Sequence, residues 1–334
     1  MARARPLQEA FGAGAFALRR GEPLNLVRVL FGTAAAACAF VFSAHSAAYC
    51  LSYTCDTTKP NANCPMVDGC NVGGHPLHWA SSVISFDIQQ DGSKLRAITY
   101  DQLHTVASNA FQRWLDAVCE DGNHPSISVV DFGPVECAKP EYNKDQPNQN
   151  VITFHDGKWP YKNSGAETLA LTSVVFSPET GELYNADIEI NSYGDHFVLG
   201  AAQADEAAHL YDLNAVLTHE IGHFLGLSHS LNQQATMFNS YRLGMSTLES
   251  DDVAAICASL PPERAAADPG SPPGVPRHGF TTECGQSESG CCSSTIGGRV
   301  PPSGPIALWA FGLGAVAWRA RGRFKKRPVR ALPH

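Results

Sequence analysis

The residues best suited to carry chemistry lie in one short segment, His219 to His229, which reads HEIGHFLGLSH. On a helix, residues four apart lie one turn above each other, so His219 and His223 can present two imidazoles to one metal ion. Glu220 lies about 100° around the same helix, where its carboxylate can reach a water molecule beside the ion. Gly226 can end the helix in a left-handed turn that returns His229 to the other two imidazoles. Three neutral imidazoles with one open position are typical of catalytic zinc.

The specificity of this pattern comes from its full length. HExxH alone is a weak signal, because amphipathic helices with exposed histidine and glutamate also produce it. The glycine and the third histidine at fixed offsets make a chance match much rarer. The alternative, three unrelated surface histidines, is therefore the weaker interpretation, and a metal site is predicted.

The segment resembles the signature of the metzincin zinc endopeptidases, HExxHxxGxxH followed by a methionine turn. The methionine here is Met237, eight residues after His229 in the sequence ATMF. A serine directly after the third histidine, here Ser230, is similar to the pattern of the matrixin branch of this family, the branch that is matrix-metalloprotease-like. The resemblance covers about residues 75–260 and implies an α+β fold of the zincin type. Met237 would then pack beneath the metal.

The resemblance also implies a site and a reaction, with one catalytic Zn²⁺ as cofactor. Its expected ligands are His219, His223 and His229. Glu220 is expected to take a proton from the attacking water and to pass it to the leaving amine. Protein or peptide substrates would pair in extended form with the strand Leu169–Phe176 by β-augmentation.

Three alternatives stay open at this point. Calcium is a second candidate ion, since Asp187, Glu189 and Asp195 offer hard oxygen ligands, although scattered acids are usually solvated. A catalytically silent, surface-displayed binding module of the same fold would keep the architecture without the reaction. A zinc amidase acting on cell-wall peptides would keep the metal chemistry on another substrate.

Residue patterns around the motif predict one mixed, twisted β-sheet of about five strands with three main helices. The expected strands are Val83–Ile88, Ile127–Phe132, Val151–Phe154, Leu169–Phe176 and Ala186–Asn191. The expected helices are Asp101–Val118, with Asp101 as its cap, Leu213–Leu225 and Glu249–Leu260.

Composition bounds the function. The chain has 334 residues, 44% of them hydrophobic and 17% charged, which is ample for a core and excludes a disordered chain. Its formal net charge of −8 argues against a nucleic-acid partner. The body is expected to be a monomer.

The two ends predict export. Residues 1–48 combine a basic start, an apolar stretch and small residues at 46–48, as in a signal peptide. The order of a Cys patch, the hydrophobic segment 300–318 and the basic tail 319–334 resembles the sorting tails of myxobacterial surface proteins (MYXO-CTERM type). This tail predicts membrane contact before any processing; a retained transmembrane anchor is the alternative. The protein is therefore expected to be secreted or held at the cell surface.

Cysteines and prolines indicate how residues 49–299 are divided into segments. In an oxidising compartment, Cys50, Cys55, Cys64 and Cys70 are expected to form disulfides that staple an N-terminal segment, residues 49–74, with their connectivity left open. Cys119 and Cys137 are predicted to pair with each other. Residues 75–260 form the expected catalytic domain. Residues 261–299, rich in Pro and Gly, are predicted to be a solvated linker that carries the Cys patch.

Overall fold

A computed structural model describes residues 48–56, 62–161, 168–264 and 273–285, and the backbone of 314–320. The expected signal peptide, apart from Ala48, lies outside the described residues, as do residues 321–334 of the basic tail.

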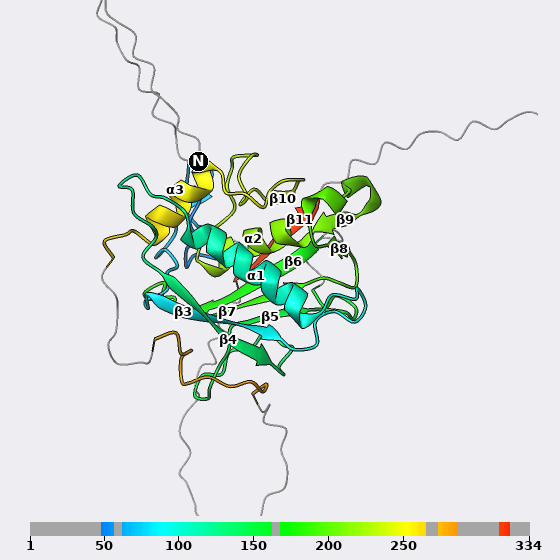
Figure 1. The fold of residues 1–334 in the computed structure, drawn as a ribbon. Coiled ribbons are helices and arrows are strands. Elements are labelled where there is room, and N and C mark those ends of the chain that lie inside the picture. The colour runs from blue at the N-terminus through cyan, green and yellow to red at the C-terminus, as the bar shows by residue number, and fades with distance from the viewer. Residues whose placement is uncertain (1–47, 57–61, 162–167, 265–272, 286–313, 321–334) are drawn as a thin grey trace, which may run out of the picture. The chain divides into compact units, whose positions relative to one another are not determined.

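Five strands form the mixed sheet, and their bounds are close to those expected. Their spatial order is β4 (Ser128–Val135), β3 (Val83–Gln89), β5 (Val151–Phe154), β7 (Leu183–Ile190) and β6 (Thr168–Phe176). Strand β3 pairs in parallel with β4 and β5, and β5 pairs in parallel with β7. Strand β6 is antiparallel to β7. This arrangement confirms the mixed α+β class (Figure 1).

Two further strands extend the sheet beyond β6. Strand β11 (Gly314–Ala320) is antiparallel to β6, and β10 (Ser240–Tyr241) is parallel to β11. Two short pairs lie outside this sheet: β1 (Met66–Val67) with β2 (Cys70–Asn71), and β8 (His196–Val198) with β9 (Leu210–Asp212). Single 3₁₀ turns occupy Ala201–Gln203 and Glu206–Ala208.

Three α-helices complete the fold: α1 (Tyr100–Leu115), α2 (Leu213–Phe224) and α3 (Ser250–Ser259). Helices α1 and α2 cover one face of the sheet (Figure 1). The N-cap of α1 is Thr99, not Asp101 as the sequence predicts. Thr99 and Gln102 satisfy each other's backbone N–H groups in a capping box, which moves the helix start upstream of the aspartate.

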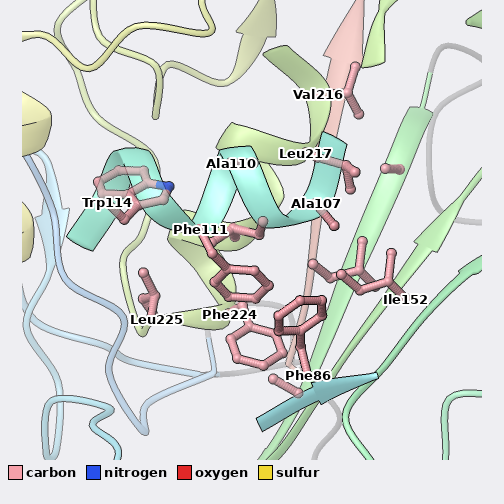
Figure 2. Packing of buried hydrophobic residues seen from close by; sticks show 14 of the residues in the cluster. Phe86, Ala107, Ala110, Phe111, Trp114, Ile152, Val216, Leu217, Phe224 and Leu225 are labelled. Atoms are coloured by element: carbon pink, nitrogen blue, oxygen red, sulfur yellow. The ribbon is translucent and has the colours of Figure 1, made fainter. Parts of the chain in front are cut away.

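Aromatic side chains hold the two covering helices to the sheet. Phe111 of α1 stacks on Phe86 of β3 at 4.6 Å between ring centroids and meets Phe224 of α2 edge-on at 5.3 Å. Trp114 Nε1 donates to the Thr218 carbonyl at 2.8 Å, so this buried indole is satisfied while it packs (Figure 2). These contacts fix the position of α2, the helix that carries the HExxH motif.

Disulfides confirm one cysteine prediction and correct another. Cys50–Cys70 and Cys55–Cys64 staple the N-terminal segment. The predicted pair of Cys119 with Cys137 is wrong, because Cys119 bonds Cys257 and Cys137 bonds Cys284. Strand β4 lies between residues 119 and 137, and its eight residues span about 25 Å, which holds the two cysteines at opposite ends of the strand.

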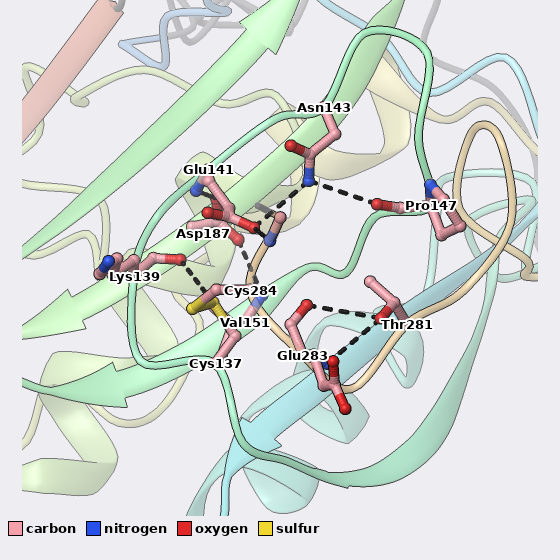
Figure 3. Close-up of a disulfide and its surroundings, with 11 residues drawn as sticks. Cys137, Lys139, Glu141, Asn143, Pro147, Val151, Asp187, Thr281, Glu283 and Cys284 are labelled. Carbon is pink, nitrogen blue, oxygen red and sulfur yellow. Dashed lines mark hydrogen bonds between the residues drawn. A yellow bond between two sulfur atoms is a disulfide. The ribbon is translucent and has the colours of Figure 1, made fainter. Parts of the chain in front are cut away.

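Residues 273–285 run along the body and differ from the solvated linker that the sequence predicts. Phe280 packs edge-on against Phe132 of β4 at 5.0 Å. The Thr282 carbonyl accepts hydrogen bonds from the Glu136 and Cys137 N–H groups at 2.8 and 3.0 Å. The Cys137–Cys284 bond closes this contact (Figure 3). Composition missed the segment because its contacts are mostly to backbone atoms, which need no apolar periodicity.

Only part of the predicted hydrophobic segment, residues 300–318, lies within the described residues. Residues 300–313 lie outside the described residues, while 314–318 belong to β11. In the part of the chain that the structure describes, no helix is both long and apolar enough to cross a membrane.

Candidate metal centre and active site

Helix α2 carries three of the four predicted chemical residues into the interior. Asp212 caps the helix by accepting from the Asn214 N–H at 3.0 Å. Nearly all side chains of α2 are buried, including His219, Glu220 and His223. A helix buried on all sides must satisfy its polar groups by specific contacts, so each of these side chains is held by a defined partner.

The chain turns back immediately after α2. Gly226 has φ +98°, and a Cβ there would lie 2.8 Å from the Leu77 carbonyl oxygen, so both the conformation and the space favour glycine. The Gly226 and Leu227 N–H groups close the helix end on the carbonyls of His223 and Gly222, each at 3.0 Å. The turn brings the His229 ring to 4.8 Å from that of His223, between centroids.

The three imidazoles converge, and His219 and His223 approach each other through their Nε2 atoms. His219 Nδ1 lies 2.6 Å from the Thr236 carbonyl, and His223 Nδ1 lies 2.9 Å from the Leu227 carbonyl. A carbonyl oxygen only accepts, so both Nδ1 atoms carry the proton and both Nε2 atoms present lone pairs. Those two Nε2 atoms are 3.1 Å apart, although two acceptors repel each other at this distance. All three candidate ligand atoms lie within 4.8 Å of one another.

This donor set fits a zinc ion. Tetrahedral ligands at about 2.0–2.1 Å from zinc are separated by about 3.3 Å, close to the distance between the first two nitrogens. His229 Nε2 is buried and has no hydrogen-bond partner among the described residues. Burial lowers the pKa of all three histidines, and it brings that of His223 to about 4, so the rings are neutral as ligands must be.

Glu220 lies beside the ligands and is held from the edge of the sheet. Its Oε2 accepts a hydrogen bond from Thr172 Oγ1 of β6 at 2.6 Å. Its Oε1 is buried and has no partner among the described residues. Desolvation raises the pKa of Glu220 to about 8 despite the hydrogen bond from Thr172. Thr172 is a site residue that the sequence does not reveal, since a threonine in a strand carries no distinguishing signal.

Met237 lies directly under the motif helix. A Cβ added to Gly222, between the two ligands of α2, would lie 2.2 Å from Met237 Sδ. The methionine turn is fixed by Asp252 of α3, whose carboxylate accepts from the Met237 N–H at 3.0 Å and the Thr236 N–H at 2.7 Å. Asp252 is the second residue that sequence reasoning missed. Its place in the first turn of α3 indicates only a helix start.

Two of the three acids considered for calcium, Asp187 and Glu189, have other partners. Asp187 is buried and accepts from the Val151 N–H at 2.8 Å and from the Glu141 N–H at 3.1 Å. Glu189 accepts a hydrogen bond from Tyr161. Burial raises the pKa of both carboxyl groups. Asp187 thus links the strand β5 to the loop before it.

A comparison with known families agrees with this geometry. Residues 78–259, more than half of the chain, match the family model described as Matrixin (Peptidase M10). The chain belongs to the matrixin family. This matrixin is 25% identical over 194 residues to "Matrix metalloproteinase-C" of Caenorhabditis elegans, a match that covers 56% of the chain and 29% of that protein. It is 27% identical over 164 residues to "Metalloendoproteinase 1-MMP" of Arabidopsis thaliana, covering 49% of the chain and 38% of that protein.

Proposed function

We propose that this matrixin is a zinc-dependent endopeptidase, secreted or attached to the cell surface, that hydrolyses peptide bonds. One observation carries the proposal: the candidate ligand atoms of three neutral histidines lie within 4.8 Å of one another, and the carboxylate of Glu220, the neighbour of His219 in the chain, is buried. The names of the two relatives support the same class of activity.

The site residues have different roles in the proposed hydrolysis. Zinc, when held by the three histidines, supplies a Lewis acid that polarises the substrate carbonyl and activates water. Glu220 accepts a proton through Oε1, because Thr172 already occupies Oε2. A nearby cation would lower the raised pKa of Glu220 toward neutrality, the range that suits a general base and then a general acid. The Thr236 and Leu227 carbonyls keep the imidazoles of His219 and His223 in the ligating tautomer.

The disulfides support the proposed location. Four of them join the described residues, two within the N-terminal segment and two between distant parts of the body. Such bonds form and persist in oxidising compartments, so they favour export. The C-terminal tail remains our candidate for membrane contact before processing.

The test uses the full chain and two matched glutamate variants. Wild type should bind one zinc per chain by elemental analysis and should cleave unfolded protein; a chelator should abolish cleavage and added zinc should restore it. Glu220→Ala should keep the zinc and lose about 10²- to 10⁴-fold in kcat/KM. Glu120→Ala, at an exposed glutamate, is the control and should match wild type.

Two outcomes would contradict the proposal. A zinc-loaded protein that cleaves no protein, either as wild type or with β11 disrupted by Val316→Pro and Ala317→Pro, would identify a silent binding module. Cleavage of purified cell-wall material without cleavage of unfolded protein would identify an amidase.

A further inference from the structure

Strand β11 lies between two segments that flank the candidate site. On one side it runs antiparallel to β6, with Val316 opposite Thr172 and Ala317 opposite Leu171. On the other side it runs parallel to β10, with Arg319 opposite Ser240. Figure 1 shows β11 as the red arrow beside β6 and β10, far in sequence from both. A segment more than 70 residues after β10 therefore fills the edge of the sheet.

The register places this strand next to the chemistry. Thr172, the partner of Val316 in the ladder, is the residue whose hydroxyl group holds Glu220. Strand β10 begins three residues after Met237. The backbone of β11 thus occupies the edge on which an extended peptide would pair if it were presented to Glu220. This inference rests on the proposed function for what such a peptide would be.

We propose that residues 314–320 of the chain occupy in cis the edge between β6 and β10 on which a substrate of the proposed peptidase would pair, so that the tail inhibits its own site. Main-chain pairing of this kind reads an extended backbone before it reads side chains. A peptide substrate must then displace β11, so the tail competes with other peptides in cis.

The connection to the body favours this occupancy. The Cys137–Cys284 bond attaches residue 284 to the end of β4, and residues 286–313 separate it from β11. Those 28 residues can reach about 90 Å when extended, which is ample for the return to β6. An attached segment of this kind is present at its own site at an effective concentration of about millimolar order. A free peptide of similar affinity would compete poorly at lower concentrations.

The described cysteines offer no alternative way to block the metal. All eight are paired in disulfides, so none of them has a thiolate to donate to an ion. Cys70, which precedes Asn71 and Val72 in the N-terminal segment, is bonded to Cys50. Within the described residues, the pairing of β11 is the contact that can restrict access to the site.

The first experiment breaks the ladder in the full chain with Val316→Pro and Ala317→Pro together. Neighbouring N–H groups of a strand point to opposite sides, so one of the two prolines removes a donor that faces β6. The control places the same pair at Ala307 and Leu308, before β11. The β11 variant should show at least a tenfold higher kcat/KM on peptides than wild type and the control. A synthetic peptide of residues 312–322 should inhibit it competitively.

A second experiment is independent of catalysis. In the Glu220→Ala background, a labelled 312–322 peptide should bind the β11 variant at least tenfold more tightly than the intact chain. Amide protons of residues 168–176 should exchange faster in the β11 variant. Equal peptide binding and equal exchange in both forms would overturn the inference and leave the proposed protease intact. If the labelled peptide binds more tightly to the β11 variant but no form of the protein cleaves peptides, the inference about β11 is supported and the proposed protease is refuted.

Discussion

Gly222 offers the sharpest test of how the metal site is built. It lies in α2 between the candidate ligands His219 and His223, and a Cβ added there would lie 2.2 Å from Met237 Sδ and 2.9 Å from Trp114 Cζ2. Neither neighbour can move freely. The Met237 N–H is bound to Asp252 at 3.0 Å, and the Trp114 indole donates to the Thr218 carbonyl at 2.8 Å. We therefore expect Gly222→Ala to destabilise the protein.

The magnitude follows from two opposing effects. Alanine is favoured over glycine inside a helix by about 1 kcal/mol. Overpacking a filled core typically costs about 1–3 kcal/mol, and an overlap at 2.2 Å belongs at or above the upper end. The free energy of unfolding should fall by about 2 kcal/mol. Since relief requires α2 or Met237 to shift, zinc affinity should also fall by about tenfold, which corresponds to about 1.4 kcal/mol.

Urea unfolding and competition with a chromophoric chelator measure the two quantities. Gly157→Ala is the control, because a Cβ at Gly157 meets nothing within 4 Å. Adding Met237→Ala to Gly222→Ala should recover part of the loss, giving a favourable coupling in the double-mutant cycle. If Gly222→Ala is as stable as wild type, with unchanged zinc affinity, the close packing of the methionine beneath the helix is refuted.

Three more predictions concern stability. Desolvation raises the pKa of Asp87 from 3.8 to about 7. The stability that the protonated carboxyl group contributes is therefore fully present below about pH 4 and is lost as the pH rises through 7. In urea unfolding between pH 4 and 7, Asp87→Asn should reduce the fall in unfolding free energy by up to about 1.4 kcal/mol per pH unit. Cys119→Ser with Cys257→Ser should lower the unfolding free energy by about 3–5 kcal/mol, and a loss below 1 kcal/mol would contradict a structural role. Asp252→Ala should lose about 3 kcal/mol and weaken zinc binding, with Asp252→Asn between it and wild type; an unchanged affinity would show that the carboxylate does not support the site.

The sequence could predict which three imidazoles come together, because their geometry is local. A spacing of four residues on a helix, and a glycine at its end, determine where His219, His223 and His229 lie. Thr172 and Asp252 could not be predicted in the same way. Thr172 is 48 residues from Glu220 and Asp252 is 15 from Met237, and no spacing rule brings strands and helices together over such distances.

The same limit explains the errors in the fold. Strand periodicity located β3 to β7 closely, because one face of each strand packs on the helices. Cysteine pairing depends on which ends of those strands meet, and proximity in sequence gave the wrong partner for Cys119. Residues 314–318 are apolar enough to suggest a membrane segment, but apolar composition also suits a strand at a sheet edge.

The contact between Asp252 and the methionine turn has a consequence for how the protein matures. Thr236 offers its carbonyl to His219 and its N–H to Asp252, so α3 helps to orient the His219 ring. Synthesis runs from the N-terminus, and the HExxH helix therefore emerges before the residue that steadies its partner. A nascent chain of between 229 and 251 residues would contain all three imidazoles without Asp252. The candidate metal site can therefore form completely only late in synthesis, after nearly the whole domain has been made.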